Sequence, residues 1–596
     1  MKKLKHLPSV TELLVVNNTS QLSKQIKEAE LELVMFVAEH NLSFAVLDHL
    51  PQFMSSVCKD STIAENIKCG RKKATVICKN VIASQRLRLL SEHLKNNWYS
   101  LIIDETTDIS NKQCLAIIVR HYNKYDHVEG AFLGLCQVEE GTVEGLFRTV
   151  KNLLDVNEIP LNKLIGFAAD NCSVMQGNKK GVQKLFQKEV PSIHIQGCVC
   201  HSLALCSSNA CLQLPKSVEA LARDIVNYFS HSSKRQTDFE VFQIFAEIKP
   251  HILLKLSQTR WLSLEAVVNR ILEQWPALIL YFSNEVYENK NLINPLDILE
   301  ALKNDVFKFY FNFLSYILDM MNKINKEFQS ESPKLYCLYN RMASLFKIIL
   351  KNVMVNENVM VNEYVDSTSL YNITFYPRNF KPLEMIYLGA KSEIMMRGPN
   401  NISENDMSSL KKYCLKFYIE ICKQISNRFD FSDSVLEFLE NFHPEKVMSG
   451  KCQSLVTLVT RFPNLERDVE VLDFEWRLLV NMSEFKNQAN KEFTEFWKYI
   501  FNLKNGLNEP LLPTLTKFMK AILCLPHSSA SAERVFSELN LIKSKNRNRL
   551  HIDTCNALLL TKSLLGKNQC YNFEPPDCFI RNNKIVESEV IEDVTF

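Results

Sequence analysis

The sequence predicts an α/β protein in which a short group of strands lies within a mostly helical chain. Glycine and proline are scarce, at 14 and 19 of 596 residues, so the chain is not turn-rich throughout. Hydrophobic residues make up 46% and charged residues 23% of the chain. This composition is typical of globular proteins and excludes a disordered or fibrous chain. At about 150 residues per domain, the length allows two to four domains.

Three short runs rich in isoleucine, valine and leucine follow Trp98, namely YSLIIDETTD, CLAIIVRHYN and AFLGLCQVE. Polar turns separate these runs, so we expect three consecutive antiparallel strands. An amphipathic helix (VEGLFRTVKNLLDV), an apolar run (LIGFAAD), a helix over 181–189 and a short strand (SIHIQG) follow. Strand, strand, strand, helix, strand, helix, strand is the order of a ribonuclease H-like fold.

Two long stretches with helical patterns flank this block. Residues 1–94 repeat apolar residues at three- and four-residue spacings. Residues 211–505 are rich in Phe, Leu, Lys and Asn, with no alternating strand pattern that persists. We therefore divide the chain into a helical N-terminal region (1–94), the first part of a ribonuclease H-like core (95–210), an all-helical insertion (211–505), a C-terminal block (506–566) and a polar tail (567–596).

The chain carries no pattern that directs it to a membrane or out of the cell. Its N-terminus lacks the apolar core and cleavage site of a signal peptide, and no run of eighteen apolar residues occurs. The 18 cysteines are scattered and form no CxxC pair, so we expect reduced thiols and an intracellular protein. Net charge is only +3, so any nucleic-acid surface is a local patch.

Three acidic residues lie where an apolar strand or a helix is expected to begin or end. Asp104 ends the run LIID, and Asp170 ends FAAD. Glu533 lies in ASAERVFSEL, the expected start of a helix after Pro526. Carboxylate oxygens from neighbouring strands can share Mg²⁺ or Mn²⁺. Each acid taken alone is weak evidence for a metal site and is better explained as a solvated residue in a turn.

Five motifs occur in a fixed order along the chain: IIDETTD, AADNCSVMQG, CVCHSLAL, TRWLS and LPHSSASAERVFS…KNRNRL. Together they resemble the hAT superfamily of DNA transposases, named for hobo, Activator and Tam3, over roughly residues 95–565. The first motif is most similar to the domesticated, transposon-derived branch in animals. The resemblance implies that the C-terminal block completes the ribonuclease H-like core and mediates formation of a homo-oligomer.

The resemblance also implies the catalytic residues. Asp104, Asp170 and Glu533 correspond to the DDE triad, which binds Mg²⁺ or Mn²⁺ for DNA strand cleavage and transfer. Asp108 is a rival for the first position, but Asp104 is better placed at the strand end. His201, with Cys198, matches the CxxH motif of the family, whose histidine acts near the scissile phosphate.

The TRWLS motif implies a further contact with DNA. Arg260 and Trp261 match the RW motif of the family, whose tryptophan stacks on a flipped base during hairpin formation. An indole offers such a base a flat apolar platform, worth about 1–3 kcal/mol. A buried core tryptophan is the alternative for Trp261.

Two clusters of basic residues are candidates for phosphate contacts. The C-terminal cluster supplies the DNA-binding candidates Arg534, Lys543, Lys545, Arg547 and Arg549. Cys198 and His201 of the CxxH motif are further candidates for contact with DNA. The N-terminal cluster comprises Lys68, Arg71, Lys72, Lys73 and Lys79. A solvated loop explains the C-terminal cluster equally well. For the N-terminal cluster a solvated helix face or loop is favoured over a DNA contact or a nuclear signal.

Residues 194–211 are dense in cysteine and histidine, which raises the alternative of a structural zinc site. The possible ligands are His194, Cys198, Cys200, His201, Cys206 and Cys211. Cys198 and Cys200 are only two positions apart, which is too close for the usual zinc knuckle, and no second pair follows. We expect most of these cysteines to be small core residues on a helix.

The sequence therefore predicts a hAT-type transposase, or a protein derived from one, that acts on DNA in the nucleus. Active members usually carry a BED-type zinc finger, and without a CxxC pair we expect none in this sequence. The chain is then either a truncated transposase or a host protein derived from one. The second hypothesis is a non-catalytic nuclear scaffold that dimerises and binds DNA or protein partners. A cellular ribonuclease H-like nuclease is a weaker third hypothesis, because it needs neither the helical insertion nor the C-terminal motif.

Overall fold

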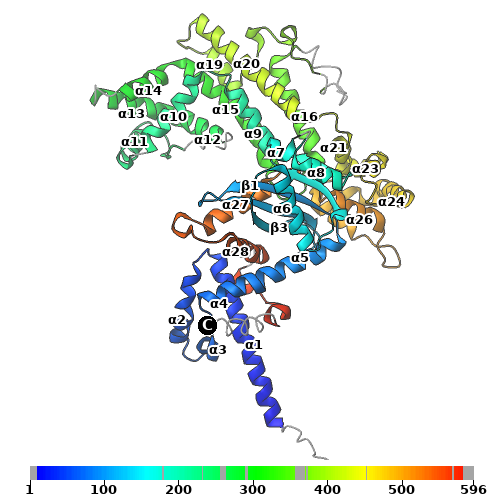
Figure 1. The fold of residues 1–596 in the computed structure, drawn as a ribbon. Helices are drawn as coiled ribbons and strands as arrows, with labels where there is room; N and C mark the ends of the chain where they lie inside the picture. Colours follow the sequence, from blue (N-terminus) through cyan, green and yellow to red (C-terminus); the bar gives the residue numbers. More distant parts are fainter. Residues whose placement is uncertain are drawn as a thin grey trace, which may run out of the picture.

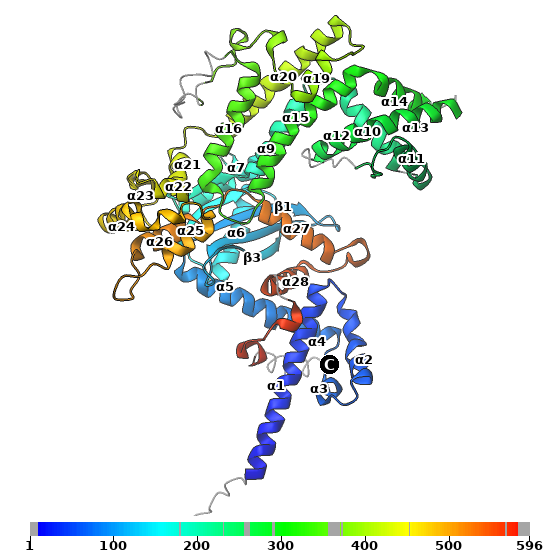
Figure 2. The same ribbon diagram turned by 180° about the vertical axis from the view of Figure 1, so that it is seen from behind.

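The structure is a computed structural model. It describes residues 10–177, 180–230, 232–254, 263–288, 293–355, 370, 373–451, 453–566 and 569–581. A β-sheet lies in the middle of the molecule, with the N-terminal helices on one side and a long helical region on the other (Figure 1). Figure 2 shows the same three levels from behind. None of the described helices is long and apolar enough to cross a membrane.

The sheet contains five strands in the spatial order β3-β2-β1-β4-β5. The strands are β1 (Tyr99–Thr107), β2 (Gln113–Tyr122), β3 (Val128–Gln137), β4 (Leu164–Ala169) and β5 (His194–Gly197). β1, β2 and β3 pair antiparallel, as the sequence predicts, whereas β4 pairs parallel with β1 and β5 parallel with β4. Helix α6 (Val143–Val156) precedes β4, and the helices α7 (Ser173–Gln176) and α8 (Val182–Glu189) precede β5. The expected order of strands and helices is confirmed, with α7 as an addition.

Alternate residues of the central strands face opposite sides of the sheet, because side chains alternate along a strand. Leu101 and Ile103 of β1 belong to the hydrophobic cluster that includes Phe186 of α8. Ile102 belongs to a different cluster, which includes Ala532 of α27 (Ala530–Ile542). One face of the sheet is therefore covered by α6 and α8, and the other by the C-terminal helices.

The N-terminal residues that the structure describes are helical, as predicted. The helices are α1 (Val10–Glu39), α2 (Leu50–Val57), α3 (Thr62–Asn66), α4 (Arg71–Val76), a π-helical stretch (Ile77–Ala83) and α5 (Ser84–Asn96). Helix α28 (Ile552–Leu565) lies between these helices and the sheet. The Cys78 and Thr561 side chains are 3.4 Å apart, and Asn556 Oδ1 accepts a hydrogen bond from Leu135 N at 2.9 Å. The N-terminal helices and α28 therefore pack together beside the sheet.

The chain between β5 and α27 is mostly helical where the structure describes it, with irregular segments and two isolated β-bridges between the helices. The helices are α9 (Val199–Cys211), α10 (Lys216–Ser230), α11 (Ser233–Phe245), α12 (Ser263–Glu273), α13 (Trp275–Glu288), α14 (Ile293–Lys303), α15 (Asp305–Phe328), α16 (Leu335–Val353), α19 (Ala390–Arg397), α20 (Glu404–Arg428), α21 (Ser434–Leu439), α22 (Pro444–Met448), α23 (Val456–Arg461), α24 (Val469–Asn481), α25 (Phe493–Phe501) and α26 (Pro513–Ile522). Helices α10 to α14 form an arm that projects to one side (Figure 1).

Candidate active site

Asp104 lies within β1 and not at its end, which corrects the expectation from the sequence. The strand continues to Thr107 because its last residues still pair with β2, where Asp104 is opposite Ala116. On the other side of β1 the pairing with β4 stops earlier, at Ile102 and Ala168. Asp104 therefore comes two residues after the last β1–β4 pair, on the face that α27 covers.

Asp170 occupies the corresponding position after β4, two residues beyond Ala168. Its Oδ1 accepts a hydrogen bond from Cys172 N at 3.4 Å. Glu533 lies in the first turn of α27, which packs against β1 and β2. Two neighbouring parallel strands and one helix thus bring the three predicted acids to the same end of the sheet.

Electrostatic interaction among these acids shows that they are close in space. Burial and the negative charges of Asp170, Cys198 and Glu533 raise the pKa of Asp104 to about 8. Glu105, which the sequence analysis did not single out, also interacts with Asp170, and burial together with this charge raises its pKa. A neutral Asp104 relieves the repulsion when no cation is near.

The donor chemistry of the triad suits a divalent cation, but the side chains do not form a closed ligand shell. Hard carboxylate oxygens that repel one another are the ligands that Mg²⁺ and Mn²⁺ prefer. Over the described ranges, however, no group of three or more His, Cys, Asp or Glu side chains is arranged so that it could hold a metal ion.

Cys198 connects the helix that follows β5 with the start of α27. Its Sγ accepts hydrogen bonds from His201 N at 3.5 Å, which caps α9, and from Ser529 N at 3.4 Å. The neighbouring Cys200 thiol and these N–H groups lower the pKa of Cys198 to about 7. The side chain is fully buried, so it does not face DNA. The expected DNA contact by Cys198 does not fit this structure, because its sulfur holds two helix starts together.

His201 lies in the first turn of α9 and is half-buried. It is three residues from Cys198, whose charge acts on Asp104, so this turn lies close to the acids. The loop after Asp170 is fixed to the same helix, because Asn171 Nδ2 donates to the Cys198 carbonyl at 3.0 Å and to Ser202 Oγ at 2.8 Å. The CxxH segment thus borders the acidic site. Its buried cysteines, Cys198, Cys200 and Cys206, belong to the hydrophobic core, as expected.

The segment before α27 is held by the end of α15. Ser528 Oγ donates to the Phe328 carbonyl at 2.9 Å, and His527 Nε2 donates to the Ser330 carbonyl at 3.2 Å. These contacts join residues about two hundred positions apart. They fix the helix that carries Glu533 between the sheet and the long helical region.

Arg534 and Lys543, two of the predicted DNA contacts, have protein partners. Arg534 is exposed and pairs with Glu331 at 3.1 Å. Lys543 Nζ lies 2.6 Å from Asp108 Oδ2, and their side chains are only 3% and 2% exposed. The predicted phosphate contact by Lys543 is therefore wrong for this structure, because its ammonium group is buried in an ion pair. This pairing also places Asp108, the rival for the first catalytic position, outside the acidic site.

The other cations of this segment are more accessible. Lys545 and Arg549 are exposed. Arg547 is half-buried and donates through Nη1 to the Asn41 carbonyl at 3.2 Å. Of the predicted C-terminal contacts, Lys545 and Arg549 are thus the best placed to meet a phosphate.

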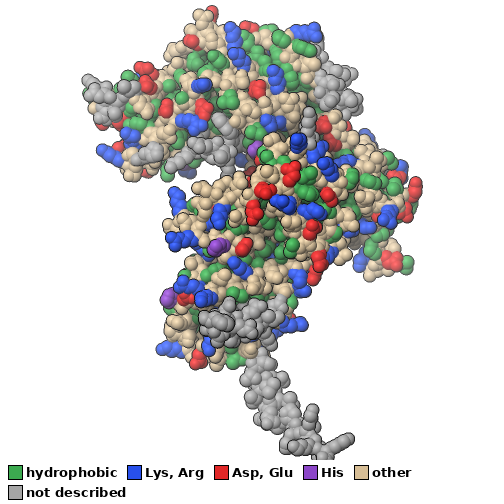
Figure 3. All heavy atoms as spheres, in the orientation of Figure 1, with side chains coloured by type: hydrophobic (Ala, Val, Ile, Leu, Met, Phe, Trp, Pro, Cys, Tyr) green, Lys and Arg blue, Asp and Glu red, His purple; other side chains and the backbone are tan. Residues whose placement is uncertain are grey.

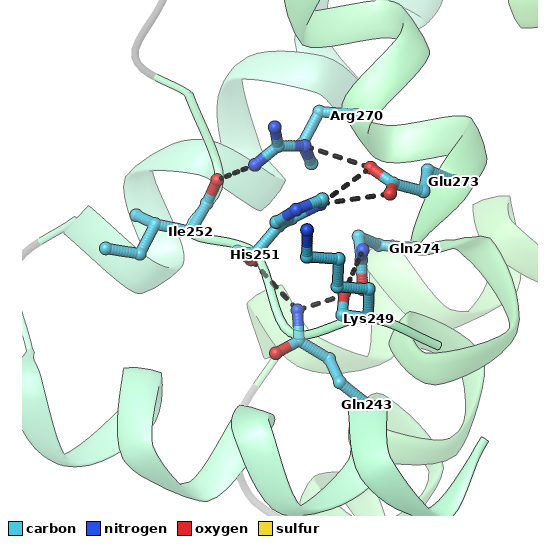
Figure 4. A network of polar contacts seen from close by, with 7 residues as sticks. All are labelled: Gln243, Lys249, His251, Ile252, Arg270, Glu273 and Gln274. Carbon is cyan, nitrogen blue, oxygen red and sulfur yellow. Dashed lines mark hydrogen bonds and ion pairs between the residues drawn. The ribbon is translucent and has the colours of Figure 1, made fainter. Parts of the chain in front are cut away.

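Arg260 and Trp261 lie outside the described residues, so the RW motif stays a prediction. The chain just before it is held by a polar network (Figure 4). His251 Nδ1 lies 2.9 Å from Glu273 Oε1, and Arg270 donates to the Ile252 carbonyl at 2.6 Å. Gln243 donates to the His251 carbonyl at 2.9 Å. Sequence reasoning missed this network, because its members are spread over thirty residues without a motif.

Two family models match the chain. Residues 25–181, which contain Asp104 and Asp170, match the model described as "ZMYM1/FAM200, RNase-like domain". Residues 477–565, which contain Glu533, match the model of the hAT family C-terminal dimerisation region. The mixed sheet and these two matches define a transposase-derived protein with an RNase-like domain and a dimerisation region. Together the two matches support a hAT-family, transposase-derived protein.

Proposed function

We propose that the protein is a hAT-type DNA transposase, or an enzyme derived from one, that cleaves and transfers DNA strands in the nucleus. The juxtaposition of Asp104, Asp170 and Glu533 carries this proposal. Three carboxylates from separate segments meet on one end of a sheet, and each lies within a family match. In this proposal residues 211–505 are an insertion into a ribonuclease H-like core, which the C-terminal helices complete.

Mg²⁺ or Mn²⁺ would be held by Asp104, Asp170 and Glu533. When bound, the cation supplies Lewis acidity to the phosphodiester and to an attacking water or 3′-hydroxyl. Asp104 would have a fixed backbone, because it lies within β1, and Asp170 directly follows β4, whereas Glu533 would move with α27. His201 would act on the DNA phosphate from the neighbouring helix, and Lys545 and Arg549 would contact the DNA backbone.

A titration of the full chain with Mn²⁺, followed by the electron paramagnetic resonance signal of the free ion, tests the proposal. We expect the wild type to bind Mn²⁺ and Asp104→Ala to bind about tenfold or more weakly, since loss of even an outer-shell partner has effects of this size. Asp224→Ala removes an exposed carboxylate of α10 and serves as the matched control, with unchanged binding. Equal binding by the wild type and Asp104→Ala would contradict the catalytic proposal.

A second candidate function is a non-catalytic scaffold that dimerises and binds DNA or protein partners. It is supported by the match of residues 477–565 to the hAT C-terminal dimerisation region, which needs no catalytic site. The C-terminal dimerisation region serves both candidates. A chain that self-associates but binds no Mn²⁺ above the Asp104→Ala level would support the scaffold.

A further inference from the structure

A groove lined by cations lies between the N-terminal helices and the turn after α27. It has a volume of about 870 Å³. We call it the cationic groove. The main residues that line it are Phe44, Arg71, Lys72, Arg547, Arg549 and Leu550. No Asp or Glu is among the described residues that line it. Figure 3 shows lysine and arginine side chains on the side of the molecule where the turn after α27 lies above the N-terminal helices.

The cations of the groove lack enough anionic partners. Arg71 pairs with Asp48, but no hydrogen bond or ion pair in the described part of the chain engages the exposed side chains of Lys72 and Arg549. Arg547 Nη2 is buried and has no hydrogen-bond partner. A buried guanidinium N–H without an acceptor is costly, so the groove is suited to a ligand that brings carboxylate or phosphate oxygens.

The floor of the groove distinguishes between these two kinds of ligand. Phe44, Val76 and Leu550 give it an apolar surface next to the cations. A bare phosphate backbone would leave this surface without a partner. A peptide that alternates acidic and apolar side chains would satisfy both the rim and the floor.

Residues 582–596, which lie beyond the described chain, have this composition. The sequence NNKIVESEVIEDVTF contains one basic residue and the four acids Glu587, Glu589, Glu592 and Asp593. Apolar residues stand between and beside the acids, as in VESEVIEDV. We propose that this acidic tail binds in the cationic groove of its own chain. The proposal does not depend on DNA cleavage.

The tail is long enough to reach the groove. Asp577 lies 2.9 Å from Lys24, which fixes the preceding chain to the middle of α1. The groove begins just past the end of α1, about fifteen residues or 22 Å further along the helix axis at 1.5 Å per residue. A fifteen-residue segment spans up to about 50 Å when extended.

Binding of a fluorescent peptide of residues 582–596 to the full chain, followed by fluorescence anisotropy, tests the proposal. The receptor carries Glu587→Gln, Glu589→Gln, Glu592→Gln and Asp593→Asn, which leave the groove open. We expect this receptor to bind the peptide, and the wild type to bind it about tenfold or more weakly, because the attached tail competes at a high effective concentration. Affinity should fall as salt rises.

Groove variants locate the binding site. Lys72→Glu with Arg549→Glu in the tail-neutral receptor should weaken binding about tenfold or more, since two attractions become repulsions. The matched control is Lys391→Glu with Lys412→Glu, which reverses two exposed lysines on α19 and α20, far from the groove (Figure 1). Lys72→Gln with Arg549→Gln repeats the test if the charge reversal impairs folding, as judged by circular dichroism.

Four results would overturn the proposal. Equal affinity of the groove and control variants would place the peptide elsewhere, and equal affinity of the wild type and the tail-neutral receptor would leave the attached tail outside the groove. If a fifteen-base-pair DNA duplex binds through Lys72 and Arg549 while the peptide does not, the occupant is a nucleic acid. If light scattering shows that the wild type loses its self-association when the tail is neutralised, the tail binds a second copy.

Discussion

Asp108 and Lys543 form a buried ion pair that joins the end of β1 to the end of α27. Although burial alone raises it, the pKa of Asp108 is lowered by the hydrogen bond from Lys543 and by the N–H groups of Lys112 and Ser110. An ammonium group in such a site is costly to transfer from water, and the carboxylate offsets this cost only while both partners are present. Lys543 therefore stabilises the fold, whereas its neighbour Lys545 is exposed and does not.

Replacing Lys543 by methionine should destabilise the protein. We expect Lys543→Met to lower the free energy of unfolding by about 3–5 kcal/mol, because Asp108 stays buried without its cation. Lys545→Met should change it by less than about 0.5 kcal/mol, since this side chain is exposed. Urea unfolding measures both. Adding Asp108→Asn to Lys543→Met should recover part of the loss, and no recovery would mean that the ion pair is not the cause.

The segment that leads into α27 is positioned by close contact with a strand as well as by hydrogen bonds. Gly166 of β4 pairs in the sheet, and Pro526 lies directly over it. A Cβ atom at this glycine would lie 2.7 Å from Pro526 Cδ and 2.5 Å from Ser100 Oγ. The missing side chain thus lets the segment before Glu533 approach β4, the strand that directly precedes Asp170. This contact sets the distance between two elements of the candidate site.

Gly166→Ala should separate these elements. We expect a loss of about 1–3 kcal/mol in the free energy of unfolding, because the proline and the strand cannot both keep their places. The control is Gly506→Ala, where an added Cβ meets no atom within 4 Å, and there we expect no loss. Urea unfolding of both variants checks the prediction. A loss no larger than that of Gly506→Ala would show that the segment shifts without strain.

At the scale of the molecule, local pattern predicted the sheet but not what covers it. The alternating runs after Trp98 specify three strands, and the parallel pairing of β1 and β4 then brings Asp104 beside Asp170. Packing between distant segments leaves no periodic trace in the sequence. The partner of Lys543 is 435 positions away, so the stretch KSKNRNRL appeared to be a solvated or phosphate-binding segment.

The third acid shows the same limit. Glu533 is more than three hundred residues from Asp170, and only the family motif connected the two in the sequence. The structure connects them through Cys198, whose Sγ accepts a hydrogen bond from the backbone N–H of Ser529. Spacing could not have shown this, because a cysteine that accepts hydrogen bonds has the same local pattern as one that packs in the core. Buried polar groups that join distant segments also make the stability of the fold depend on pH.

Three buried histidines should make the fold sensitive to acid. Burial lowers the pKa of His121 and His194 to about 4 and that of His527 to about 3. The unfolded chain titrates near 6.5, so between pH 6.5 and these values it binds more protons than the folded chain. The contribution of these histidines to the free energy of unfolding is therefore fully present above pH 6.5. It falls as the pH drops, by at most about 1.4 kcal/mol per pH unit for each histidine.

His527 offers the sharpest test, because it joins the α27 segment to the end of α15. Glutamine can keep a donor for the Ser330 carbonyl but does not titrate. Between pH 7.5 and pH 5, His527→Gln should therefore lose about 2 kcal/mol less of its free energy of unfolding than the wild type. His551→Gln removes an exposed histidine and should follow the wild type. Urea unfolding at the two pH values measures the difference, and an identical loss in all three proteins would mean that His527 is protonated in the folded state as readily as in the unfolded one.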